Sequence, residues 1–274
     1  MSIYGKIAEA EKSNTAIAVC TVISTKGSTP AKTGAKMLVK EDGSIYGTVG
    51  GGELERKAIQ DALAVIGQNE PRLFRHDLLH QHSMCCGGVV ELYIEPVIRQ
   101  SRLYIFGAGH VGSVLAKYSA DAGFEVVVID DRKDYTDAIT IEGVNKMNLD
   151  FDLALKLLPF DRQTYIAIMT YDHAIDRNIL SFCIKKPHAY LGMIGSERKV
   201  LVTRKQFMDA GIATEEELNA VDMPMGLIPD SDGPVEIAIS ILAKLITVKH
   251  SLRRSNKIQT AHTTAKADKQ APVK

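Results

Sequence analysis

The sequence predicts an α/β protein in which an N-terminal α+β domain precedes a Rossmann-like domain with a doubly wound parallel sheet. Three observations predict this class. An apolar run at 103–106 leads into Gly107, Gly109 and Gly112, which have the spacing G-x-G-x-x-G. Apolar residues then recur at helical spacing. A second apolar run ends in Asp130, 23 residues after the first glycine. This order of strand, glycine turn, helix, strand and acid is typical of a dinucleotide-binding unit.

Each glycine of this motif has its own expected role. The first permits a tight turn, the second lets a pyrophosphate approach the backbone, and the third lets the helix pack close to the strand. The free amides and the positive end of the helix favour an anion. Asp130 is expected to bind a ribose hydroxyl if the ligand is a nucleotide. The predicted cofactor-binding residues of the motif are Gly107, Ala108, Gly109, His110, Val111, Gly112 and Asp130.

The α+β domain is expected over residues 1–98. Its β-branched runs indicate strands, and an Asp42-Gly43 turn between two apolar stretches predicts a hairpin. Three adjacent glycines lead into a helix with acids in its first turn, as the helix dipole prefers. The expected elements are helices at 2–12 and 53–66 and strands at 16–24, 36–40, 45–49 and 89–97.

The Rossmann-like domain is expected over residues 102–250, after a short polar link. Alternating apolar strands and amphipathic helices continue beyond Asp130, as parallel sheets require. Further strands are expected at 143–147, 165–169 and 189–193, and helices at 151–158, 173–185, 198–210, 215–220 and 234–249. Residues 251–274 hold six basic residues and one acid, which predicts a basic disordered tail.

The composition argues against several classes of protein. Lys+Arg and Asp+Glu are both 33, so no general affinity for nucleic acid or for a membrane surface is expected. No apolar run approaches the ~20 residues that span a bilayer. Four cysteines in a chain of 274 residues do not form a disulfide framework, and a cytoplasmic location is expected.

Two glycine-rich pieces of the first domain are candidate sites. Gly50, Gly51 and Gly52 expose backbone amides at a helix start, which suits an oxyanion, although a sharp turn alone explains them equally well. The pair Cys85-Cys86 precedes two more glycines. A thiol there is either a buried packing residue or a nucleophile and soft-metal ligand. Apart from this thiol, no metal site is predicted.

Two loops of the second domain follow predicted strand ends, where ligands of open α/β sheets bind. The first contains Asp172 and His173, and the second contains Gly195 and Ser196. Asp172 serves as a helix cap in the simpler interpretation. All four residues are predicted to line the same crevice as the glycine motif.

Several of these pieces, in this order, resemble the xanthine dehydrogenase accessory family, XdhC/CoxI. The resemblance extends from about residue 14 to 248, and Cys86-Gly87-Gly88 lies at the family's Cys-Gly-Gly position, with Cys85 as an additional neighbour. The sequence departs from the family before the last helix, where Gly233 replaces a threonine cap. The matching segments are 25–30, 34–39, 50–55, 86–91, 103–112, 171–173, 192–199 and 236–241.

The resemblance implies a chaperone that binds the molybdenum cofactor and assists its sulfuration and insertion into an apo molybdenum hydroxylase of the xanthine dehydrogenase type. It also implies a homodimer, and a cysteine desulfurase as a further partner. In this interpretation Cys86 and Cys85 are the candidate catalytic residues, and Cys86 is the expected molybdenum contact. Molybdopterin carries phosphate that the glycine turns suit, and a thiol is a soft partner for molybdenum.

Two other functions remain open from the sequence. The first is an NAD(P)-dependent oxidoreductase, which Asp130 favours, with Arg132 leaving room for a 2′-phosphate. No recognisable acid/base pair for hydride transfer accompanies the motif, so a cofactor-insertion chaperone is favoured over a dehydrogenase. The second is a nucleotide-binding regulatory module without catalysis.

Overall fold

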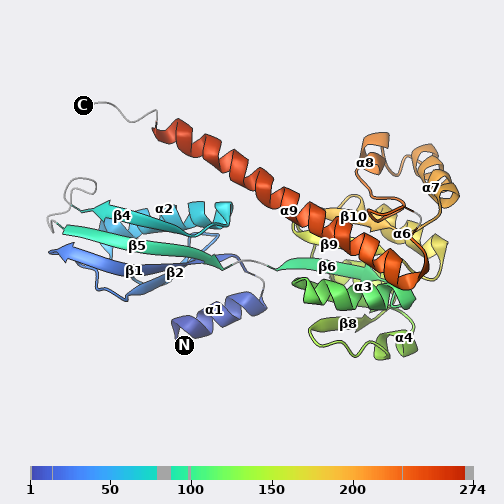
Figure 1. Cartoon of the computed structure of the whole chain (residues 1–274), viewed down its shortest axis with the longest axis horizontal. Coiled ribbons are helices and arrows are strands. Elements are labelled where there is room, and N and C mark those ends of the chain that lie inside the picture. Colours follow the sequence, from blue (N-terminus) through green and yellow to red (C-terminus); the bar gives the residue numbers. More distant parts are fainter. Residues whose placement is uncertain (1, 14, 79–87, 98–99, 230, 269–274) are drawn as a thin grey trace. The chain divides into compact units, whose positions relative to one another are not determined.

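The computed structural model describes residues 2–13, 15–78, 88–97, 100–229 and 231–268. The chain divides into two compact units, Met1–Arg99 with Arg253–Lys274, and Gln100–Leu252. Each unit holds its own five-stranded sheet (Figure 1).

The first unit contains an antiparallel sheet with the strand order β3-β2-β1-β5-β4. The predicted hairpin is confirmed, because β2 pairs with β3 across the Asp42-Gly43 turn. The elements are α1 (Ile3–Lys12), β1 (Ile17–Gly27), β2 (Lys36–Lys40), β3 (Ile45–Gly47), α2 (Gly52–Gln68), β4 (Arg72–Asp77) and β5 (Gly88–Val97).

Helices cover both faces of this sheet. Leu54, Ala58 and Ala62 of α2 recur at helical spacing and are buried against one face. On the other face, Ile3 and Ile7 of α1 pack against a smaller apolar cluster. The apolar alternation of β1 therefore serves two cores, one under each helix.

The second unit is a Rossmann sheet in which all neighbouring strands are parallel, in the order β10-β9-β6-β7-β8. Counted from β6, this is the 3-2-1-4-5 order of a doubly wound fold, which reverses direction between β6 and β9. The elements are β6 (Ser101–Phe106), α3 (His110–Asp121), β7 (Phe124–Asp130), α4 (Lys133–Asp137), β8 (Val144–Asn148), α5 (Phe151–Leu157), β9 (Thr164–Ile168), α6 (His173–Cys183), β10 (Tyr190–Met193), α7 (Glu197–Asp209), α8 (Glu215–Asn219) and α9 (Gly233–Asp268).

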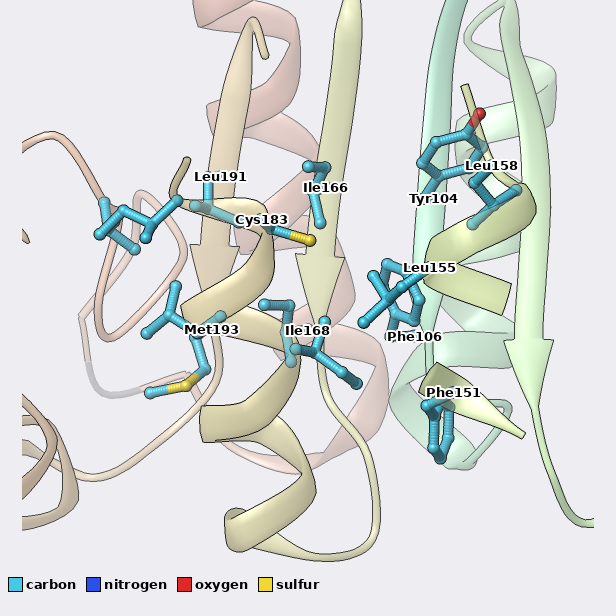
Figure 2. Packing of buried hydrophobic residues seen from close by; sticks show 14 of the residues in the cluster. Tyr104, Phe106, Phe151, Leu155, Leu158, Ile166, Ile168, Cys183, Leu191 and Met193 are labelled. Carbon is cyan, nitrogen blue, oxygen red and sulfur yellow. The ribbon is translucent and has the colours of Figure 1, made fainter. Parts of the chain in front are cut away.

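Each face of the parallel sheet has its own apolar core. Figure 2 shows the first, where Phe106 and Ile168 of the sheet pack with Phe151 and Leu155 of α5 and with Cys183 of α6. The second core joins the other face to α3 and α9. The near-continuous apolar runs in β6 and β9 follow from burial on both faces.

Three parts of the structure differ from the sequence predictions. Strand β4 was not predicted, because one of its inward positions is a histidine, His76, and the alternation of apolar residues is lost. The short helix α4 was also not predicted. Helix α9 continues to Asp268, past residue 251 where a disordered tail was predicted. No glycine or proline interrupts residues 251–268, so the backbone has no helix breaker there.

Helix α3 approaches β6 so closely that only glycine fits at position 112. A Cβ atom at Gly112 would collide with the carbonyl oxygen of Gly107. A Cβ atom at Gly109 would meet no heavy atom within 4 Å. Gly112 is therefore required for packing, whereas Gly109 lies at an open position.

We expect Gly112→Ala to lower the free energy of unfolding by about 3 kcal/mol, because backbone must shift to admit the methyl group. Gly109→Ala is the matched control and should change it by less than about 1 kcal/mol. Urea unfolding followed by circular dichroism measures both. Equal stability of the Gly112→Ala variant and the parent protein would show that the helix is not held against the strand as described.

Candidate functional site

The glycine loop after β6 lies beside the end of β9. Gly107 has φ +118, and a Cβ atom there would run into the backbone of Met169 and lie 3.1 Å from the Cα atom of Thr170. The Met169 amide also donates to the carbonyl of Phe106 at 2.9 Å. The loop therefore sits at the reversal point of the sheet, where a crevice for ligands is expected in this fold.

The start of α3 presents backbone amides from an unobstructed turn. Gly109 is the N-cap residue of α3, and because it has no side chain it forms no capping hydrogen bond of its own. The first amides of a helix have no partner within the helix. With the open space at Gly109, these amides suit a phosphate group. The amide of Ala108 is already used, because it donates to Oδ2 of Asp130 at 2.7 Å.

The carboxylate of Asp130 is fully enclosed and fully hydrogen-bonded. Its side chain is 0% exposed. Oδ1 accepts from the amide and Nε of Arg132, at 3.0 and 2.9 Å, and Oδ2 accepts from the Arg132 Nη2 at 2.8 Å as well as from Ala108. Burial alone would raise the pKa of Asp130, but these donors and the arginine charge hold it below its usual value. Asp130 thus holds the end of β7 and the glycine loop together.

Two tyrosine rings hold the Arg132 side chain in place. Its guanidinium carbon lies 3.8 Å from the ring centre of Tyr135 and 4.2 Å from that of Tyr171. The hydroxyl of Tyr171 donates to Oδ2 of Asp131 at 2.8 Å. The edge of the Arg132 guanidinium is therefore hydrogen-bonded to Asp130. Its faces pack against the rings of Tyr135 from α4 and of Tyr171 from the loop after β9.

The start of α6, just after the loop that follows β9, carries a histidine and a buried acid. Asp176 accepts from the amide and the hydroxyl of Thr170, at 2.9 and 2.7 Å. Its other oxygen lies 3.5 Å from Nδ1 of His173. Burial raises the pKa of Asp176, with the hydrogen bonds from Thr170 and His173 opposing the rise. The Nε2 atom of His173 is buried, and no described residue forms a hydrogen bond with it. Asp172 caps α6 through the amide of Ala174, as the simpler interpretation predicted.

The loop after β10 leads into α7 through Gly195 and Ser196. Ser196 is the N-cap residue, but its side chain forms no capping hydrogen bond. Next to this strand, Asp222 accepts from the Tyr190 hydroxyl at 2.7 Å and from the Gly226 amide at 3.0 Å. The loop before α9 is thereby held against β10.

Acids at the start of α9 bond to local backbone. Asp232 accepts from the Gly233 amide at 2.9 Å, and Glu236 accepts from the Asp232 amide at 3.0 Å. The departure from the family pattern at Gly233 therefore leaves the helix start with carboxylate acceptors in place of a threonine cap.

The glycine turn of the first unit is already filled by one of its own side chains. Oε2 of Glu55 accepts from the amides of Val49 and Gly51, at 3.4 and 3.2 Å, and from the Thr48 hydroxyl at 2.5 Å. All of Gly50, Gly51 and Gly52 have positive φ. An incoming oxyanion would have to displace Glu55, because the carboxylate of Glu55 occupies the predicted site at Gly50–Gly52.

The candidate catalytic residues Cys85 and Cys86 lie outside the described residues. Gly88, which follows them, pairs with Gly27 of β1, and a Cβ atom at Gly88 would lie 2.6 Å from the Ser28 carbonyl oxygen. Gly27 and Ser28, in the matching segment 25–30, therefore lie beside Gly88. Cys20 and Cys183 are buried, and burial raises the pKa of each thiol to about 12, so neither suits a nucleophile. Within the described ranges, no three His, Cys, Asp or Glu residues are grouped to hold a metal.

Residues 103–245 match the XdhC Rossmann domain, and residues 10–77 match the XdhC and CoxI family. The chain belongs to the XdhC family. Both matches follow the order that the sequence motifs predicted. The α/β class with a Rossmann unit is likewise confirmed. None of the helices in the described part of this XdhC-family chain is long and apolar enough to cross a membrane.

Three curated relatives resemble this XdhC-family chain. It is 33% identical over 257 residues to the uncharacterized protein YqeB of Escherichia coli K12, covering 92% of this chain and 47% of that protein. It is 26% identical over 159 residues to a probable xanthine dehydrogenase component of Bacillus subtilis 168, covering 58% and 46%. It is 23% identical over 279 residues to the molybdenum cofactor insertion chaperone PaoD of Escherichia coli K12, covering 88% and 86%. The chain spans about half the length of the first two relatives.

Sequence reasoning did not find two groups of residues at this site. Tyr135 and Tyr171 meet around Arg132 although one comes from α4 and the other from the loop after β9. Asp176 lies one turn inside α6, where an acid normally signals only a helix start. The sole signal for the first group was an arginine two residues after the motif acid. Residues from the loops after β6, β7 and β9 do meet, as the parallel sheet requires.

Proposed function

We propose that this protein binds the molybdenum cofactor and assists its insertion, in sulfurated form, into an apo molybdenum hydroxylase of the xanthine dehydrogenase type. The observation that carries the proposal is the open turn at Gly109, in front of the free amides of α3, in a member of the XdhC family. A relative that matches over most of both chains is named a molybdenum cofactor insertion chaperone, which supports the same role.

The residues of the Rossmann unit have separate roles in this proposal. The amides at 109–112 bind the cofactor phosphate, since they are unobstructed and lie at the positive end of a helix. His173 offers a buried ring nitrogen that Asp176 orients, and it donates or accepts one hydrogen bond at the cofactor. After β10, Gly195 contributes a small residue, and Ser196 contributes a hydroxyl that does not cap α7.

A thiol is proposed to contact the molybdenum centre or its sulfur ligand. Cys86 is the candidate, with Cys85 beside it, because the thiols of Cys20 and Cys183 are buried with raised pKa values. A cysteine desulfurase is proposed as the sulfur source. The protein is expected to act in the cytoplasm.

The proposal is tested by activation. The purified protein, loaded in a host that makes molybdopterin, is mixed with an apo xanthine dehydrogenase, and the appearance of hydroxylase activity is followed. We expect activation to require the loaded protein. If free cofactor activates the apo-enzyme equally well with and without this protein, the insertion role is wrong.

We expect Gly109→Val to weaken cofactor binding by at least about tenfold, or 1.4 kcal/mol, because its side chain fills the space that a phosphate needs. The pterin retained after purification measures this. Gly109→Ala is the control and should lose less, since it adds a single methyl group. Unchanged pterin content in the Gly109→Val variant would show that the phosphate binds elsewhere.

We expect Cys86→Ser to reduce activation of the apo-hydroxylase by at least about tenfold, while Cys85→Ser retains most of it. A hydroxyl is a poorer ligand than a thiolate for a soft metal centre. Cys183→Ser is a matched control for a buried thiol. Full activation by the Cys86→Ser variant would leave this cysteine a packing role only.

The protein is also proposed to form a homodimer through its core domains, because a carrier needs cover for a labile cofactor and exposed strand edges invite pairing. Light scattering of the full chain and of a chain truncated after His250 tests this. We expect dimers of both at micromolar concentration. A monomeric full chain would disprove the dimer, and a monomer of the shortened chain alone would show that the tail is needed.

A further inference from the structure

The end of β7 is where a Rossmann dinucleotide normally places a ribose and the ring attached to it. In that arrangement the acid at the strand end accepts hydrogen bonds from ribose hydroxyls. The position in this chain is held by Asp130, and Arg132, Tyr135 and Tyr171 surround it. Whether a nucleoside fits there depends on which acceptors and which ring surfaces remain free.

No acceptor remains free on Asp130. A carboxylate offers about four lone-pair positions. Two donors reach each oxygen, all within 3.0 Å, and the side chain is 0% exposed. Two of the four donors belong to the Arg132 guanidinium and a third is the Arg132 backbone amide, so a ribose hydroxyl reaches Asp130 only after the guanidinium has left.

The ring faces next to Asp130 are occupied as well. The guanidinium of Arg132 lies between Tyr135 and Tyr171, within 4.2 Å of both ring centres. A planar base that stacked on the inner face of either tyrosine, beside Asp130, would take the place of the guanidinium. Tyr171 is further anchored to Asp131, which joins the loop after β9 to the end of β7.

The local charge also disfavours a second phosphate. Asp130 and Asp131 both face this edge, and Arg132 is the cation between them. Because the arginine is already neutralised by Asp130, a 2′-phosphate would approach a surface with excess negative charge. The Arg132 side chain therefore does not serve as a phosphate receptor.

We propose that Arg132 closes the nucleoside half of this Rossmann site, so that the protein selects a ligand that ends in a phosphate group and rejects dinucleotides. This inference rests on the proposed function and specifies its cargo as the cofactor form that ends in a single phosphate group, with no nucleotide attached. The phosphate sits on the amides at 109–112, and the rest of the ligand extends toward the loops after β9 and β10, away from β7.

The test uses NADH as a dinucleotide probe and follows its fluorescence on titration with the purified full chain. The parent protein should show no saturable binding below about 1 mM. Arg132→Ala should bind NADH at least about tenfold more tightly, because it frees one acceptor position on each oxygen of Asp130 and the tyrosine faces that the guanidinium covers. Arg162→Ala is the control. It removes the same charge just before β9 begins, at the end of the strand away from the glycine loop, and should bind NADH as weakly as the parent does.

A second variant guards against misfolding of Arg132→Ala, which leaves a buried carboxylate without its main partner. Tyr171→Ala removes one of the two rings that hold the guanidinium, so Arg132 leaves Asp130 more easily and the variant should also gain NADH binding, by a smaller factor. Micromolar binding of NADH by the parent protein would overturn the closure, as would the absence of any gain in the folded variants. Neither result depends on the pterin content of the protein, which tests the cargo role separately.

Discussion

The hydrogen bond between the Asp130 carboxylate and the Ala108 amide organises the edge of the Rossmann unit at which we propose that the ligand binds. It links the end of β7 to the glycine loop 22 residues earlier in the chain. Two backbone hydrogen bonds also hold the glycine loop in place. The Gly107 amide donates to the Ile129 carbonyl, and the Met169 amide donates to the Phe106 carbonyl. Arg132 stabilises this arrangement, because a buried carboxylate without a cation would cost several kcal/mol. The loop is therefore shaped before any ligand arrives, which lowers the entropic cost of binding.

The same edge divides the site into an open part and a filled part. The open part is the turn at Gly109 with the helix amides behind it. The filled part is the stack of Arg132 between Tyr135 and Tyr171. In the first unit the glycine turn is likewise filled by Glu55. Glycine-rich turns in this family member thus differ in whether they still have amides to offer, although their sequences look alike.

The sequence predicted the class of fold because hydrophobic periodicity and glycine spacing are local signals. The parallel strand order, the hairpin of the first unit and the packing role of Gly112 follow from such signals. The contents of the site were less predictable. Asp130 was expected at a ribose, yet its partners come from the glycine loop and from Arg132. Tyr135 and Tyr171 are 36 positions apart, and only the tertiary fold brings them to one guanidinium. Likewise, nothing local to Gly50–Gly52 showed that Glu55 fills that turn.

The most direct test of the proposed carrier role is to identify what the protein binds. The full chain is purified without denaturation from a host that makes molybdopterin, the bound material is released, and its pterin, metal and nucleotide contents are measured per chain. The account predicts pterin and molybdenum in comparable amounts, with one phosphate per pterin and no nucleoside. A bound nicotinamide dinucleotide, with no pterin or molybdenum, would contradict it.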